Sequence, residues 1–182
     1  MYPERMEKKE VKMRRIIMLC VALVGLTAPA RAEPGRVLAC HDGDTCHVLT
    51  AEGIINVRMA GLDAPEDPWP GRWVKQPGAD EARDALWKMI GDKTVDLECT
   101  GQHSYRRDVC RTTVRIDGNP VDVSEALVSE GWAWSAIQFE PAHDRDQRMP
   151  DLQAAAQAAG RGLWGLQAGR RIPPWEWRHG GR

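Results

Sequence analysis

The chain has 182 residues, of which 42% are hydrophobic and 28% charged, and its formal net charge is −1. This composition is that of an ordinary globular chain with enough apolar residues for one core. The charge excludes a protein that holds nucleic acid over a broad basic surface, so any contact with a polyanion must be local.

The first 32 residues are expected to be a secretory signal peptide. Basic residues precede the apolar run of residues 16–26, and Ala30-Arg31-Ala32 then provides an A-x-A cleavage site. A membrane anchor is the alternative, but eleven apolar residues are fewer than the roughly 20 that a spanning helix needs. We therefore expect cleavage after Ala32, no membrane span afterwards, and a periplasmic or secreted protein. Met13 is an alternative start.

Removing residues 1–32 takes away seven Lys or Arg and three Asp or Glu, which lowers the formal net charge from −1 to about −5. It also removes Cys20 and leaves an even set of cysteines: Cys40, Cys46, Cys99 and Cys110. An even set in a chain bound for an oxidising compartment predicts disulfides. Three pairings are possible; Cys40 with Cys46 and Cys99 with Cys110 would each close a short loop, and buried free thiols are the alternative.

Strands and turns are expected to alternate from residue 35 to residue 61 as a β meander. A loop with three prolines, residues 67–78, leads into an amphipathic helix that ends at Gly91-Asp92. The apolar residues predicted on the inner face of this helix are Ala82, Leu86, Met89 and Ile90.

Two further strands, residues 94–99 and 109–116, are expected on either side of a polar loop, residues 100–108. Helices are expected at residues 121–131, with Gly131 as the terminator, and at residues 151–159. The predicted fold class is therefore α+β: a five-stranded barrel of the oligonucleotide-binding (OB) type with three helices. We expect this domain to span residues 33–170 and a Trp-rich tail, residues 171–182, to pack on or near it.

Two short acidic segments are the candidate metal ligands. Asp44 follows Asp42-Gly43, and Asp63 opens the sequence Asp63-Ala64-Pro65-Glu66. The eighteen residues between Asp44 and Asp63 allow a strand, a turn and a returning strand, so both carboxylates can face one site. Oxygen ligands of this kind suit a hard cation such as Ca²⁺. The alternative for each segment alone is an ordinary turn.

The downstream segment of residues 103–108 adds an aromatic side chain and two guanidinium groups. The planar fork of arginine can hold a phosphate with two hydrogen bonds. The alternative is a solvated hairpin tip in which Arg107 pairs with Asp108.

The ordered motifs Asp42-Gly43-Asp44-Thr45, Val57-Arg58, Asp63-x-Pro65-Glu66, Tyr105-x-Arg107 and Glu125-Ala126-Leu127-Val128 with Gly131 resemble the staphylococcal nuclease family over roughly residues 36–165. The resemblance implies an OB-type barrel with three helices. It also implies Ca²⁺-dependent cleavage of DNA and RNA phosphodiesters.

The resemblance also implies a metal site. Asp44 and Asp63 match the family's Ca²⁺ ligands, and Ala64 matches a ligand that acts through its backbone carbonyl. Glu66 matches the residue that activates or orients the attacking water. Asp42 and Thr45 match residues behind these ligands.

The same resemblance implies a phosphate and nucleotide site. Arg58 and Arg107 match the arginines on either side of the scissile phosphate, and Tyr105 matches an aromatic residue that contacts the other phosphate. Arg106 stands where the family more often has a glycine, which permits positive φ. Base stacking is assigned to Phe139 or Trp134. The preferred interpretation of five tryptophans is nevertheless core or lid packing: Trp132, Trp134, Trp164, Trp175 and Trp177.

These residues together predict an exported, monomeric, Ca²⁺-dependent endonuclease that leaves 3′-phosphate ends and has no stable protein partner. One alternative is a nuclease-like barrel that is catalytically weak or idle and serves as a binding or envelope-assembly module. The other is a nuclease that uses a different divalent ion.

Overall fold

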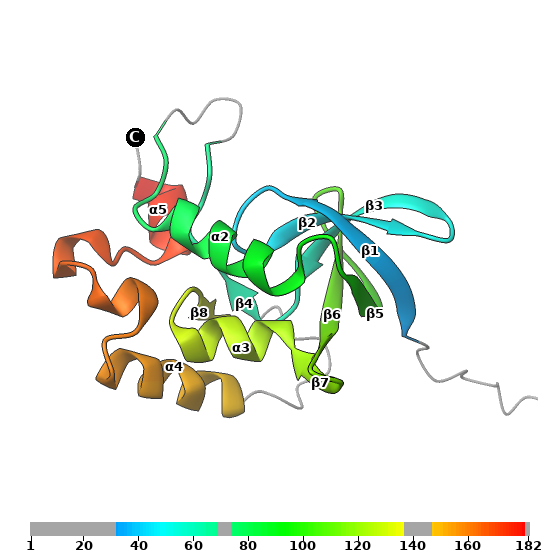
Figure 1. Cartoon of the computed structure of the whole chain (residues 1–182). Helices are drawn as coiled ribbons and strands as arrows, with labels where there is room; N and C mark the ends of the chain where they lie inside the picture. Colours follow the sequence, from blue (N-terminus) through cyan, green and yellow to red (C-terminus); the bar gives the residue numbers. More distant parts are fainter. Residues whose placement is uncertain (1–31, 69–73, 137–146, 181–182) are drawn as a thin grey trace, which may run out of the picture. The chain divides into compact units, whose positions relative to one another are not determined.

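Five strands close into a barrel because one strand, β3 (Gly53–Met59), pairs with neighbours on both of its edges. Its antiparallel partner is β2 (Thr45–Thr50), which continues to β1 (Glu33–Cys40), and β1 pairs with β5 (Thr94–Ser104). β5 pairs with β6 (Arg107–Ile116), and β6 runs parallel to the end of β3 (Figure 1). The predicted five-stranded OB-type barrel is confirmed.

This computed structural model describes residues 32–68, 74–136 and 147–180. Residues 1–31 form a separate unit of the chain and are not described. The predicted signal peptide therefore lies almost wholly outside the described residues, and Phe139 lies outside them as well. Among the helices in the described ranges, none is both long and apolar enough to cross a membrane.

Alternating apolar residues on the strands fill the barrel. Every second residue of β2 and β5 is buried over part of its length, whereas the residues between them are more exposed, as expected for strands with one face on a core. The strand residues in this core include Val37, Val48, Val57, Met59, Val95, Leu97 and Val114. Burying this apolar surface is the main favourable term for the fold.

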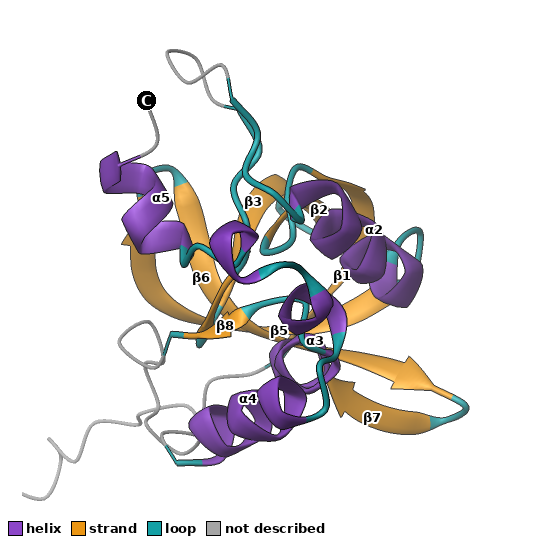
Figure 2. Cartoon of the chain, turned by 90° about the vertical axis from the view of Figure 1, so that its left-hand side faces the viewer, coloured by secondary structure: helices purple, strands orange, loops and turns teal. Residues whose placement is uncertain are grey.

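Four α-helices occur within the described ranges: α2 (Ala79–Ile90), α3 (Val123–Glu130), α4 (Arg148–Ala158) and α5 (Pro174–Gly180). Figures 1 and 2 show α3 between α4 and the strands. The remaining elements are β7 (Asn119–Asp122), which extends the sheet beside β6, the pair β4 (Leu62–Asp63) and β8 (Trp134–Ser135), and the 3₁₀ turns η2 (Gly162–Gly165) and η3 (Ala168–Arg170).

The first three of these helices were predicted, with small shifts in their ends. Three of the four inner-face residues of α2 are fully buried, and Met89 is partly buried. α3 begins two residues late because residues 119–122 pair with β6, and the Asp122 side chain then caps α3 by accepting a hydrogen bond from Glu125 N. Gly131 ends α3 with φ 82°, as predicted. α4 begins three residues early, with Pro150 in its first turn.

The prediction of a polar loop over residues 100–108 is wrong. β5 and β6 continue almost to the tip, and only Tyr105 and Arg106 connect them. A register shift between Cys99 and His103, with Gly101 at φ 74°, lets the pairing resume beyond the irregularity. Arg107 therefore lies on a strand that is paired with its neighbour, and not in a loop.

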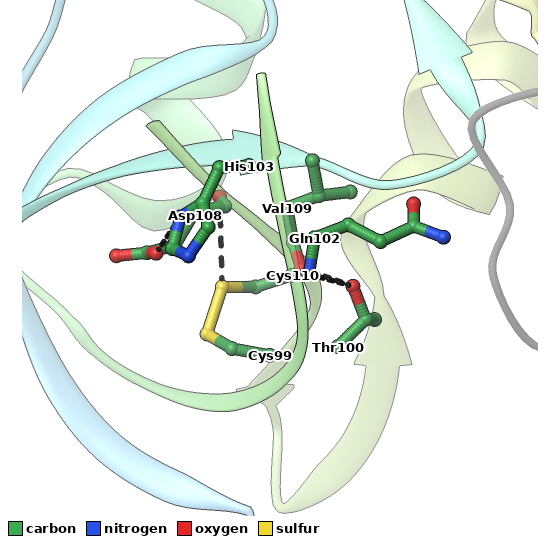
Figure 3. The surroundings of a disulfide bond; sticks show 7 residues. All are labelled: Cys99, Thr100, Gln102, His103, Asp108, Val109 and Cys110. Carbon is green, nitrogen blue, oxygen red and sulfur yellow. Dashed lines mark hydrogen bonds and ion pairs between the residues drawn. A yellow bond between two sulfur atoms is a disulfide. The ribbon is translucent and has the colours of Figure 1, made fainter. Parts of the chain in front are cut away.

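Two disulfides join the local cysteine pairs, and each lies beside a segment with candidate site residues. Cys40–Cys46 closes the turn between β1 and β2, and Cys99–Cys110 links β5 to β6 directly across the ladder. Figure 3 shows the second bond, with Thr100 and Gln102 on one strand and Val109 on the other. Both bonds fasten a hairpin near its turn.

Replacing Cys99 and Cys110 together by serine should lower the free energy of unfolding by about 2 to 3 kcal/mol, because the unfolded chain regains the freedom of a short closed loop. Urea denaturation measures this difference. Adding a reductant to the double variant should lower its stability again, because Cys40–Cys46 remains to be broken. Equal stability of the wild type and the double variant under oxidising conditions would contradict the prediction.

Candidate active site

The acidic turn between β1 and β2 is held by close packing. Asp44 N donates to Asp42 Oδ1 at 3.0 Å, and both carboxylates are buried. A Cβ on Gly43 would lie 2.7 Å from Ala64 Cβ and 2.8 Å from Ala82 Cβ. Only glycine allows the turn to approach the end of β4 and helix α2 this closely.

Arg58 joins the two predicted metal ligands. Its Nη1 donates to Asp44 Oδ1 at 2.9 Å, and its Nη2 donates to Asp63 Oδ1 at 2.7 Å. Burial alone would raise the pKa of Asp44, but the charge of Arg58, followed by hydrogen bonds from Thr45 Oγ1 and Ala64 N, lowers that pKa. Burial opposes the charged form of Arg58 too, yet the two aspartates raise its pKa. Asp44 and Arg58 therefore both favour their charged forms in a buried site.

Arg107 reaches the same cluster through Thr45. Its Nη1 donates to Thr45 Oγ1 at 3.0 Å, and Thr45 Oγ1 in turn donates to Asp44 Oδ1 at 2.8 Å. Ser104 fixes the guanidinium, since Arg107 Nε donates to its carbonyl at 3.2 Å and Nη2 to its Oγ at 3.3 Å. The alternative in which Arg107 pairs with Asp108 is not observed, because Asp108 lies 2.8 Å from His103 Nδ1.

The pKa of Asp42 is shifted in the opposite direction to that of Asp44. Burial raises its pKa well above the usual range, and the neighbouring charges of Asp44 and Glu66 raise it further. An additional cation near such a carboxyl group would lower its pKa and favour its ionised form.

Glu66 is positioned by Gln76, which the sequence analysis missed. Glu66 N donates to Gln76 Oε1 and Gln76 N donates to the Glu66 carbonyl, each at 3.0 Å. Gln76 Nε2 also donates to the carbonyl of Ile172 at 2.6 Å. The buried amide therefore connects the Glu66 backbone to the C-terminal segment.

Gln76→Leu should lower the free energy of unfolding by about 1 to 3 kcal/mol, because the Glu66 N–H and the Ile172 carbonyl lose their partner. Urea denaturation tests this. Gln102→Leu is the matched control, since Gln102 is exposed on β5, and it should change stability by less than about 0.5 kcal/mol. Equal effects of the two substitutions would mean that the hydrogen bonds of Gln76 contribute little.

Arg178, on α5, also contacts the site and was not predicted. Its Nη2 donates to Asp63 Oδ2 at 2.6 Å, and its Nη1 donates to Asp63 Oδ1 at 3.0 Å and to Glu66 Oε1 at 2.5 Å. Burial would lower the pKa of Arg178, but its bonds to the two carboxylates raise it. The only signal in the sequence was a basic residue within an aromatic tail, which is too common to identify a contact.

The chemistry of the donor set fits a hard divalent cation. Asp42, Asp44, Asp63 and Glu66 bring carboxylates to one region, and a guanidinium already occupies the space against Asp63 and Glu66 as a cation would. In the described part of the chain, no three His, Cys, Asp or Glu side chains are gathered closely enough to hold a metal. The backbone N–H of Ala64 donates to Asp44 Oδ2 at 3.1 Å.

The predicted aromatic contacts differ in their placement. Tyr105 is 95% exposed at the hairpin tip with φ 60°, and its ring lies 5.9 Å from Arg107 Cζ. The family's glycine would permit a positive φ at position 106, but in this chain the positive φ is found one residue earlier, at Tyr105. Trp134 is only 4% exposed and packs edge-on against Trp164 at 5.1 Å, which confirms its core interpretation over the alternative of base stacking.

The tryptophans follow the core interpretation in part. Trp134 and Trp164 are buried, and Trp132 is partly buried against the same cluster. On α5, Trp175 is 37% exposed, so it does not belong to the core.

Comparisons with known proteins found a matching family and several relatives. The sequence model described as staphylococcal nuclease homologue matches residues 56–165. The match includes Arg58, Asp63, Glu66 and Arg107, and the acidic turn lies before it.

Several relatives match over most of their own length. An "Uncharacterized endonuclease" of Escherichia coli is 29% identical over 92% of this chain and 99% of its own. "Protein ParB" of Escherichia coli is 30% identical over 95% and 94%, and "Micrococcal nuclease" of Shigella flexneri is 27% identical over 90% and 91%.

Proposed function

Because the chain belongs to the staphylococcal nuclease family, we propose that it is an exported, Ca²⁺-dependent endonuclease that hydrolyses DNA and RNA. The products carry 3′-phosphate ends, and the protein acts as a monomer without a stable protein partner. The relatives named endonuclease and micrococcal nuclease support the class of reaction.

One observation carries the proposal: Arg107, Thr45, Asp44, Arg58 and Asp63 form a continuous chain of hydrogen bonds. Two guanidinium groups are thus linked to one oxygen of Asp44, Arg58 directly and Arg107 through Thr45, and Arg58 also bonds to Asp63. A phosphodiester needs positive charge where negative charge develops, and a cation needs oxygen ligands.

In the proposed reaction, Asp44, Asp63 and the Ala64 carbonyl would hold the cation, with Asp42 and Thr45 behind them. A bound Ca²⁺ supplies positive charge to the phosphate. Glu66 accepts a proton from the attacking water, which bonds to phosphorus as the bond to the 5′-oxygen breaks, and that oxygen takes up a proton from solvent to leave as a hydroxyl.

Arg58 and Arg107 stabilise the added negative charge as the fifth oxygen bonds to phosphorus. Tyr105, exposed beside Arg107, contacts the neighbouring phosphate, and Phe139 is the candidate for base contact. Because the hairpin tip is open to solvent, it suits single-stranded or frayed nucleic acid.

Export is supported by the N-terminal segment and by the disulfides. A basic stretch, an apolar run and an A-x-A site precede residue 33. Two disulfides near the site suit an oxidising compartment, such as a periplasm or the cell exterior.

The test is digestion of DNA and RNA by the purified chain from residue 33. We expect cleavage of both with millimolar Ca²⁺, loss of cleavage in excess chelator, and 3′-phosphate products that a 3′-phosphatase makes extendable. A parallel series with Mg²⁺ and Mn²⁺ identifies the preferred ion. Undiminished cleavage in chelator, or none with any of the ions, would refute the proposal.

The second candidate is a catalytically weak or idle barrel that serves as a binding or envelope-assembly module. It is favoured by one observation, the pairing of Arg178 with Asp63 and Glu66. Retained binding of an oligonucleotide with no cleavage under any ionic condition would support it.

A further inference from the structure

Helix α5 brings a third arginine to the carboxylates that the proposed reaction uses. Arg178 engages both oxygens of Asp63 through its two terminal nitrogens and reaches Glu66 Oε1 as well. Asp63 is fully buried and Glu66 nearly so. Two charge-assisted bonds to one buried carboxylate make a strong contact.

We propose that Arg178 is an intramolecular counter-cation that engages the proposed metal ligand Asp63 and the neighbouring Glu66, so that a divalent cation binds only by displacing it. This inference rests on the proposed function, because it concerns the same carboxylates. It adds a regulatory contact from the C-terminal segment to the site.

Displacement is required because the oxygens are already engaged. Asp63 Oδ1 accepts from both Arg58 and Arg178, and Oδ2 accepts from Arg178. A divalent ion on the same oxygens would meet the guanidinium of Arg178 as a like charge, with little water to screen it. Arg178 must therefore move away when the ion binds.

Arg178, rather than Arg58, is the arginine that can leave. The Arg58 side chain is only 5% exposed and is held by both Asp44 and Asp63. The Arg178 side chain is 31% exposed, so it has a route to solvent. After its departure, Asp63 keeps Arg58 as a partner.

The anchor of the C-terminal segment lies upstream of Arg178. Gln76 Nε2 holds the Ile172 carbonyl, and α5 begins at Pro174. Arg178 can thus withdraw while residue 172 stays attached, so it remains close to the site and returns when the ion leaves. A tethered competitor has a high effective concentration, which raises the Ca²⁺ concentration needed to load the site.

The experiment is calorimetric titration of CaCl₂ alone into the chain from residue 33, with no nucleic acid present. Arg178→Met should lower the Kd for Ca²⁺ by about tenfold or more, the factor that corresponds to one charge-assisted hydrogen bond. Arg178→Lys should lower it by a smaller factor, because lysine keeps the charge without the planar fork.

Arg170→Met is the matched control for charge. Arg170 is exposed on η3 in the same C-terminal segment, so its loss should change the Kd by less than about twofold at physiological salt. The melting temperature of each variant is measured with and without Ca²⁺. If Arg178→Met does not fold, the Arg178→Lys titration decides the question.

An unchanged or weaker Ca²⁺ affinity in the Arg178 variants, or no Ca²⁺ binding by any variant, would overturn the inference. An equal gain in Arg170→Met would do the same, because general electrostatics would then explain it. Failure of the proposed function gives a different result: tighter Ca²⁺ binding by Arg178→Met with no cleavage of DNA or RNA at saturating Ca²⁺.

Discussion

Replacing Glu66 by glutamine is expected to lower kcat for DNA hydrolysis by about 10²- to 10⁴-fold, the usual contribution of a general base. Glutamine has the same size but cannot take a proton from water at neutral pH. The backbone N–H and carbonyl of residue 66 both remain bonded to Gln76, so the loop should keep its position. Single-turnover cleavage of a labelled oligonucleotide at saturating Ca²⁺ measures the effect.

Glu81→Gln is the control for this substitution. Glu81 is exposed in the first turn of α2, so the same chemical change there should leave kcat within about twofold of the wild type. Binding of uncleaved DNA, measured by anisotropy, should be nearly the same in both variants. A Glu66→Gln variant that retains more than about a tenth of the wild-type kcat would exclude Glu66 as the general base.

The barrel could be predicted because its strands are local in sequence and carry a clear pattern. β1, β2 and β3 follow one another through short turns, and consecutive strands usually pair. The closing pair of β3 with β6 has no local signal, because it joins residues 57–59 to residues 108–110. That pairing brings Arg107 towards Arg58, and only the resemblance to a family anticipated it.

The acidic side of the site could also be predicted from spacing. Pairing of β2 with β3 puts Thr45 opposite Arg58, one residue after Asp44, and β4 then carries Asp63. Each step uses a neighbouring strand, so the residues converge within a short stretch of chain. The hairpin tip was harder to predict, because the place of the positive φ depends on how the ladder resumes after its irregularity.

Arg178 and Gln76 could not be predicted, for a physical reason. Arg178 meets Asp63 and Glu66 across more than a hundred residues, and Gln76 meets Ile172 across 96. No periodicity encodes such a contact, and an arginine or glutamine in a loop or tail is usually solvated. Their identification depended on the folded positions of α5 and of the loop after Glu66.

Arg107→Met is expected to lower kcat by about 10²- to 10³-fold. This is the usual effect of removing one preorganised hydrogen-bond donor to the negative charge that develops in the transition state. The guanidinium is already oriented by Ser104 and Thr45, so little reorganisation is needed when the phosphate gains charge. Arg107→Lys should recover only part of this loss, because lysine keeps the charge without the two-pronged contact.

The neighbouring Arg106 provides the sharpest control for Arg107, since it lies in the same turn and is exposed. Arg106→Met removes the same charge and should leave kcat within about threefold, with at most a weaker affinity at low salt. Steady-state kinetics of the three variants on one oligonucleotide, at two salt concentrations, separates the effects. If Arg106→Met and Arg107→Met lose kcat equally, Arg107 acts through net charge alone, and the bonds that orient it would have no catalytic consequence.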